Sequence, residues 1–193
     1  MNQTANVSIM KAPIGDTQFC EAEITKRVDN AADIMAAIAR LADEHCALYL
    51  LRFQVGRMDY TVRTTPGQRC LRSLRKFDSL VRHTYNTIIG RATSDSQWAQ
   101  ACLPLREGGK GMRSAEHIAD IAYYSSRAAT WSRCEAIYAN YSSLQSDPIR
   151  ECERAINTML DDVDHVPILP CADGVQSQKA IADKTSVIRA LKL

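Results

Sequence analysis

The sequence predicts an all-α protein, an irregular multi-helix bundle in which a glycine-rich turn joins two of the helices. Three observations support this fold class. Turn-forming residues are sparse, with 8 glycines and 6 prolines among 193 residues. Apolar residues recur three and four positions apart along most of the chain, which is the spacing of one helix face. Ser, Thr or Asp residues precede several of these runs, where they can cap a helix N-terminus.

Two helices are predicted in the first third of the chain. Asp16 precedes an apolar pattern that continues to Leu41, so we expect one long helix, with a break near Asn30 as the alternative. The stretch "DEHCALYLLRFQV", residues 43–55, is apolar on most sides. We therefore expect this second helix to lie at the centre of the core and to end at Gly56.

A strongly two-sided helix is predicted over residues 66–89. Thr65 and Pro66 form a helix start, because proline in the first turn gives up no needed hydrogen bond and threonine can accept one. Gly90 provides the stop. One arc of this helix is apolar and comprises Leu71, Leu74, Phe77, Val81, Tyr85, Ile88 and Ile89. The opposite arc comprises Arg69, Arg72, Arg75, Lys76, Arg82 and His83, so we expect one side to pack and the other to carry positive charge.

Shorter helices follow in the second half. Asp95 or Ser96 can open a helix that passes through Trp98, and Leu103 before Pro104 closes it, because a residue before proline is pushed out of helical geometry. Ser114 is the expected cap of a longer helix. Further helices are predicted over 147–160 and 175–190, with an extended connector over 164–174. We expect two regions, a helical region over 1–145 and a C-terminal helical segment over 146–193.

The glycine cluster can be compared with the phosphate-loop motif. Gly108, Gly109 and Gly111 flank Lys110. A phosphate loop requires glycine, four residues and then Gly-Lys-Ser or Gly-Lys-Thr after a strand. Here Pro104 occupies the first glycine position, glycine follows the lysine, and no strand is predicted. We therefore expect a bend between helices, which uses the conformational freedom of glycine.

No cofactor or metal site is predicted. The seven cysteines include no C-x-x-C pair, and the four histidines stand alone, so neither a disulfide framework nor a zinc site is expected. Asp161 and Asp162 could hold metal ions, but at a predicted helix C-terminus we expect them to face water. No run of about 18 apolar residues and no secretory signal is present. We therefore expect an intracellular protein, nuclear or cytoplasmic, without a membrane partner.

Charge is distributed unevenly along the chain. The net charge is +2, but residues 52–91 contain nine basic residues and two acidic ones. Such asymmetry is typical of a surface that faces a polyanion. One interpretation is contact with the phosphates of a nucleic acid through Arg69, Arg72, Arg75, Lys76 and Arg82. The alternative is the solvated face of an ordinary amphipathic helix.

Several sequence blocks resemble a known family. They are "APIG" (12–15), "ALYLLR" (47–52), "YTVRTTP" (60–66), "FDSLVRHTYNTIIG" (77–90), "WAQACLPLREGGKGMRSA" (98–115) and "AYYSS" (122–126), with a weaker echo in "QSQKAIADK" (176–184). In this order they resemble the region just after the palm in reverse transcriptases of non-LTR retrotransposon-like elements. The most distinctive block contains Trp98, Leu103, Pro104, Gly108, Gly109, Gly111 and Arg113. The family usually carries leucine where this chain has Lys110 and Met112.

The resemblance implies a thumb-like helical region without its own active site. In the family the catalytic aspartates lie in the palm, upstream of the matching blocks, and Asp161-Asp162 lies downstream of them, so no catalytic residue is carried over. The leading hypothesis is therefore a fragment of an RNA-directed DNA polymerase that contacts template-primer nucleic acid but is no enzyme by itself. The second hypothesis is a structural or interaction module with an exposed apolar seam, against which a palm domain or another protein packs. A third, an independent polymerase or nuclease, requires Asp161, Asp162 and Asp164 to converge with other acids.

Overall fold

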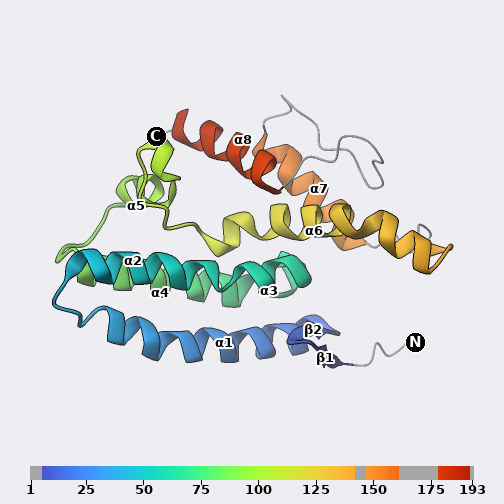
Figure 1. The fold of residues 1–193 in the computed structure, drawn as a ribbon, viewed down its shortest axis with the longest axis horizontal. Helices are drawn as coiled ribbons and strands as arrows, with labels where there is room; N and C mark the ends of the chain where they lie inside the picture. The colour runs from blue at the N-terminus through green and yellow to red at the C-terminus, as the bar shows by residue number, and fades with distance from the viewer. Residues whose placement is uncertain (1–5, 142–146, 161–177, 192–193) are drawn as a thin grey trace.

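The chain folds as the all-α bundle that the sequence predicts. A computed structural model describes residues 6–141, 147–160 and 178–191. Figure 1 shows α1 along one side, with α2 and α4 beside it, then α6, and α7 and α8 beyond α6. No helix among the described residues is both long enough and apolar enough to span a membrane.

From β1 to α6 the elements follow one another with short connections. The α-helices are α1 (Thr17–Ile38), α2 (Glu44–Gly56), α3 (Asp59–Thr64), α4 (Leu71–Ile88), α5 (Asp95–Cys102), α6 (Ala115–Ile137), α7 (Asp147–Met159) and α8 (Gln178–Leu191). Two short 3₁₀ turns are η1 (Gly67–Arg69) and η2 (Leu105–Glu107). A small hairpin of β1 (Val7–Ile9) and β2 (Ala12–Ile14) precedes α1. The predicted connector over 164–174 and the pair Asp161-Asp162 lie outside the described residues.

The hairpin is an element that sequence reasoning missed. Its strands pair antiparallel, with Ile9 opposite Ala12. The two turn residues, Met10 and Lys11, adopt φ of 49° and 66°, the geometry that two-residue hairpins need and that Asn-Gly usually signals. Tertiary contacts hold this turn, because the hydroxyl of Tyr60 donates to the Met10 carbonyl at 2.7 Å and Arg27 donates to that of Lys11.

Helix α1 runs without the break considered near Asn30. Asp16 caps it as predicted, accepting a hydrogen bond from the Phe19 amide at 2.7 Å. Ile24 and Met35 are fully buried on either side of Asn30, which itself is exposed. Asparagine lowers helix propensity by less than about 1 kcal/mol, so the packing of the flanking turns is sufficient to keep the helix continuous.

The predicted helix start at Thr65-Pro66 is wrong. Helix α3 ends there, η1 follows, and α4 begins only at Leu71. Pro66 holds Thr65 in an extended conformation with ψ of 127°, as proline does to its predecessor. Gly67 lies so close to α6 that an added Cβ would be 2.9 Å from the Ala119 methyl group. Because α6 crosses over this turn, α4 begins only after η1.

Helix α2 is less central than predicted. Ala47, Leu51 and Val55 form its buried stripe, and it ends at Gly56 as expected. However, Tyr49 is 67% exposed and Phe53 is 68% exposed. Because α1 and α4 cover one side of α2, its apolar residues on the other side face water.

Two groups of buried side chains form the core, and α6 contributes to both. The first group joins α1, α2, α3 and α4 to the start of α6. The second joins the middle of α6, around Tyr124 and Trp131, to α7 and α8. Helix α6 therefore links the N-terminal helices to the C-terminal ones, while the predicted division at residue 145 stays a prediction.

A carboxylate on α4 fixes the start of α6. Asp78 accepts a hydrogen bond from the Ser114 hydroxyl at 2.6 Å, from the Ala115 amide at 2.7 Å and from the Glu116 amide at 3.1 Å. Ser114, the predicted cap, in turn accepts from the His117 amide at 3.1 Å. Burial raises the pKa of Asp78, and its three hydrogen bonds oppose that rise. The first turn of α6 thus has its backbone donors satisfied by one residue of its own and one of α4.

We expect Asp78→Asn to destabilise the fold. The amide keeps the shape of the carboxylate but replaces one acceptor oxygen by a donor that faces other donors, and it removes a negative charge at a helix N-terminus. The free energy of unfolding in urea should fall by about 1–3 kcal/mol. As a control, Asp29→Asn removes an exposed partner of Lys76 and should change it by less than about 0.5 kcal/mol. Equal losses in the two variants would contradict the role given to Asp78.

Candidate nucleic-acid interface

Helix α4 separates apolar and basic residues as the sequence predicts. Leu74, Phe77, Val81, Tyr85 and Ile88 are buried. On the other side Arg72, Arg75, Lys76 and His83 are exposed. The structure therefore presents three of the five predicted phosphate-binding residues within little more than one turn of a helix whose opposite side is fixed in the core.

Two of these three cations form ion pairs at the surface. Arg75 Nε lies 2.9 Å from Glu116 Oε1, and Lys76 Nζ lies 2.6 Å from Asp29 Oδ1. Both cationic side chains remain more than half exposed. Exposed ion pairs contribute little to stability because water solvates both charges well. Arg75 and Lys76 can therefore exchange a carboxylate for a phosphate at small cost.

Arg72 is the least engaged of the three. It has no hydrogen bond or ion pair within the described part of the chain. Together with Lys76 it lines a shallow groove between α1 and α4. The carboxylate in that groove, Glu21, accepts a hydrogen bond from the Ser73 hydroxyl at 2.6 Å. The charge of Arg72 is thus directed to solvent rather than to a partner.

Arg69 and Arg82 occupy internal contacts instead. Arg69 belongs to η1 and donates to the Gly15 carbonyl at 2.7 Å, which ties the start of α1 to the turn before α4. Arg82 donates to Asp95 at 2.8 Å and to the Thr93 carbonyl at 2.6 Å. Its guanidinium also lies 5.9 Å from the centre of the Trp98 ring. These two residues hold neighbouring elements, so the open basic surface is formed by Arg72, Arg75 and Lys76.

The glycine cluster is a bend, as predicted, and it is closed to phosphate. Gly108 and Gly111 adopt φ of 75° and 71°, a region that glycine enters readily. The amides of Lys110 and Met112 both donate to the Ala101 carbonyl, at 3.0 and 3.1 Å. The Gly111 amide donates to the Leu103 carbonyl at 2.9 Å. These amides cap the end of α5 and are unavailable to a ligand.

The other residues of this block fasten α5 and the turn to the bundle. The Trp98 ring lies 5.7 Å from that of Tyr85, and Leu103 and Met112 are buried. Arg113 forms an ion pair with Asp59 at 3.2 Å, which joins the turn to α3. Lys110 is exposed, in keeping with a position where leucine is not needed for the core.

The described residues offer no carboxylate cluster for metal-dependent chemistry. In the ranges 6–141, 147–160 and 178–191, no three His, Cys, Asp or Glu side chains gather closely enough to hold a metal ion. Asp161, Asp162 and Asp164 lie outside these ranges. Sequence reasoning also missed Asp29 and Glu116 beside the basic residues, because both come from other helices and nothing local in the sequence signals their approach.

Comparisons with protein families, with curated proteins and with solved structures found no match. The resemblance to reverse transcriptases therefore depends on the sequence blocks quoted above, and any function has to be argued from the side chains themselves.

We expect Gly109→Ala to disrupt the turn. An added Cβ would lie 2.0 Å from the backbone oxygen of Leu103, and a backbone atom at the end of α5 cannot move aside cheaply. The free energy of unfolding should fall by at least about 3 kcal/mol, the upper end for single substitutions. Gly90→Ala is the control, because Gly90 has φ of +68° and nothing within 4 Å, so only about 1–2 kcal/mol of backbone strain is expected. Similar losses at both positions, measured by urea unfolding, would contradict the close packing of this turn.

Proposed function

We propose that the chain is a non-catalytic helical module that binds duplex nucleic acid along the exposed side of α4, as a thumb-like part of a retroelement-type reverse transcriptase. The observation that carries this proposal is the position of Arg72, Arg75 and Lys76 on one open stretch of a helix fixed in the core. They span about 6 Å along the helix axis, at 1.5 Å per residue, so they can contact neighbouring phosphates of one strand.

The energetics of such binding favour these three side chains. Lysine and arginine that neutralise phosphates release condensed counterions from the nucleic acid, and this release drives association. The existing partners Asp29 and Glu116 are exposed enough to be displaced. Contacts of this kind position a duplex without reading its sequence, which fits a thumb that holds a template-primer.

The resemblance supports the same assignment. The block "FDSLVRHTYNTIIG" belongs to α4, and the block around the glycine turn holds α5 and the start of α6. In the resembling family these blocks follow the palm, where a helical thumb faces the duplex. In that family the catalytic aspartates lie in the palm and not in these blocks, so the activity proposed for these blocks is binding.

The proposal predicts salt-dependent binding of an RNA/DNA hybrid. Affinity measured by fluorescence anisotropy should fall steeply with salt, and the variant Arg72→Gln, Arg75→Gln, Lys76→Gln should bind at least about tenfold more weakly at low salt. Its plot of log affinity against log salt should be shallower by about one unit per lost phosphate contact.

A variant with the same change of net charge is the control. Arg40→Gln, Arg57→Gln, Arg133→Gln alters three exposed cations, one just after α1, one at the end of α2 and one on α6. It should keep most of the affinity and the slope. Asp29→Asn should bind slightly more tightly, because it releases Lys76. If both triple variants lose the same affinity for the RNA/DNA hybrid, net charge alone explains the loss, and a site on α4 is contradicted.

A specific observation favours a second function, an interaction module. The outer side of α2 exposes Cys46, Tyr49, Leu50 and Phe53, which lie three and four residues apart and so form one apolar stripe. Large aromatic side chains are enriched at protein interfaces. We propose a palm-like domain as the occupant of this stripe, in keeping with the family resemblance, so that α2 faces a protein while α4 faces nucleic acid.

Two substitutions on α2 test whether the stripe serves binding and not folding. Leu51 is fully buried, so Leu51→Ala should lower the free energy of unfolding by about 2–5 kcal/mol. Phe53→Ala, two residues away, should change it by less than about 0.5 kcal/mol and leave affinity for the RNA/DNA hybrid unchanged. A large loss of stability in Phe53→Ala would show that the stripe belongs to the core and would contradict the interaction surface.

A further inference from the structure

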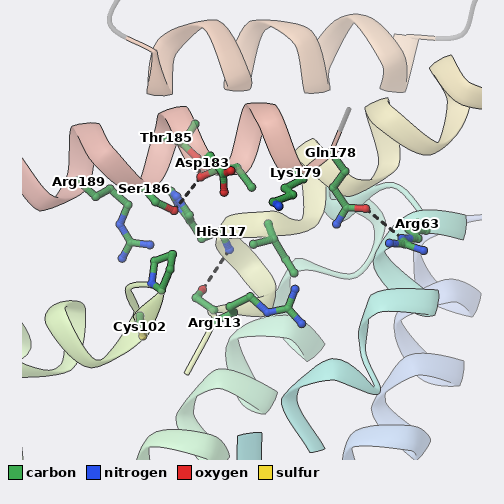
Figure 2. Close-up of a pocket in the computed structure, with 14 residues that line it drawn as sticks. Arg63, Cys102, Arg113, His117, Gln178, Lys179, Asp183, Thr185, Ser186 and Arg189 are labelled. Atoms are coloured by element: carbon green, nitrogen blue, oxygen red, sulfur yellow. Dashed lines mark hydrogen bonds between the residues drawn. The ribbon is translucent and has the colours of Figure 1, made fainter. Parts of the chain in front are cut away.

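A cavity of about 280 Å³ lies between α8, the start of α6 and the turn after α5 (Figure 2). Its lining includes none of the basic residues of α4. Its lining combines polar and apolar groups, with Ile118 and Pro104 on one part and charged side chains on the rest. A space of this kind suits a small organic ligand with a charged group.

The lining is strongly cationic. Arg63, Arg113, Lys179 and Arg189 contribute four positive charges, against the single carboxylate of Asp183. Asp183 is itself paired with Arg106 at 2.5 Å, outside the lining. Arg113 is paired with Asp59, and Arg63 donates to the Gln178 side chain at 3.0 Å. The cavity therefore holds an excess of positive charge that its own carboxylate does not balance.

Two of these cations differ in their surroundings, because Arg189 is half-buried whereas Lys179 is exposed and attracted by Asp183, four residues further along α8. Within the described residues, neither Lys179 nor Arg189 donates a hydrogen bond or forms an ion pair. Figure 2 shows both side chains extending from α8 toward α6 and the turn. A half-buried arginine without an acceptor is unusual, because desolvated charges are normally paired. An anion in the cavity would supply the missing acceptor.

His117 adds a buried group without a partner. Its Nε2 atom is buried and has no hydrogen-bond partner among the described residues. Burial, with a smaller contribution from the charge of Arg189, lowers the pKa of His117 from 6.5 to about 4. The imidazole is therefore neutral at pH 7. The start of α6 contributes nothing further, since its first amides are taken by Asp78 and Ser114.

We propose that this cavity binds the phosphate group of a small ligand between α8 and the start of α6, with Arg189, Lys179 and His117 as its partners. Arginine presents a fork of N–H groups that matches phosphate oxygens, and lysine adds a point charge. A phosphate carries more charge and more acceptor oxygens than a carboxylate, so it matches three donors better. The apolar part of the lining leaves room for the organic portion of a phosphate ester.

Binding should be linked to the protonation of His117. The titratable and charged groups that line the cavity with His117 are Arg63 on α3, Cys102 on α5, Arg113 on the turn, and Lys179, Asp183 and Arg189 on α8. Burial raises the pKa of Cys102 to about 12, so this thiol stays neutral. A bound dianion beside the imidazole favours the imidazolium form and raises the pKa of His117. A phosphate itself takes up a proton as the pH falls below about 6, so the linkage is measured as a shift in the pKa of His117 and not as a change in affinity with pH.

The test is a titration of the full chain with inorganic phosphate, with chloride at equal ionic strength as reference. Saturating phosphate should raise the pKa of His117, followed by NMR, by about one unit or more, whereas chloride should leave it in place. Arg189→Gln should weaken phosphate binding about tenfold or more. Arg133→Gln, the same change at an exposed site on α6, should leave it unchanged. Phenyl phosphate in a second arm distinguishes the source of the phosphate, since tighter binding indicates an ester and exclusion indicates the free anion.

The outcomes separate this proposal from the α4 surface. The variant Arg72→Gln, Arg75→Gln, Lys76→Gln should retain phosphate binding, because its side chains lie outside the cavity. If the pKa of His117 stays the same at saturating phosphate, the proposal is overturned. This measurement uses the unaltered chain, so it does not depend on the folding of a variant. Equal phosphate affinity of Arg189→Gln and the unaltered chain would overturn it as well.

Discussion

The carboxylate of Asp78 determines how α4 and α6 are placed relative to each other. It lies on the helix that carries the basic residues and accepts hydrogen bonds from the first turn of the helix that links the two halves of the core. Burial disfavours this charge and raises the pKa of Asp78, and three donors together with the positive end of α6 offset part of that penalty. Because α4 is held on this side and packed against α1 and α2 on others, its remaining side is a rigid surface for Arg72, Arg75 and Lys76.

The same contact explains where an anion can and cannot bind. The amides at the start of α6 donate hydrogen bonds to Asp78 and Ser114. The amides of the glycine turn donate to carbonyls at the end of α5 and just after it. Neither the start of α6 nor the glycine turn is therefore open to phosphate. Recognition of phosphate is left to side chains, in the open on α4 and enclosed beside α8. The two proposed sites suit different ligands. The three cationic side chains on α4 are exposed to a long polyanion, whereas the cavity beside α8 has room for a small ligand.

Features set by local chemistry could be predicted from the sequence, and features set by distant contacts could not. Asp16 and Ser114 were identifiable as caps because each precedes an apolar run, and the two sides of α4 followed from helical spacing. The hairpin turn at Met10 and Lys11 lacks glycine and is held by Tyr60 and Arg27, so its sequence gives no local signal. The delayed start of α4 depends on the crossing of α6 over Gly67. Likewise, the partners of Arg75 and Lys76, the exposed stripe of α2 and the cavity beside α8 all depend on helices far apart in the chain.

In the proposed complex a duplex lies along α4, and α2 is left for a protein partner. Amide NMR spectra of the labelled chain, recorded as an RNA/DNA hybrid is added, locate the duplex residue by residue. The largest shifts should fall on residues 72–76 and on the adjacent Asp29 and Glu116, which lose their ion pairs, while amides of α2 and α8 remain in place. Largest shifts on α2 or α8, or an unchanged spectrum at low salt, would contradict it.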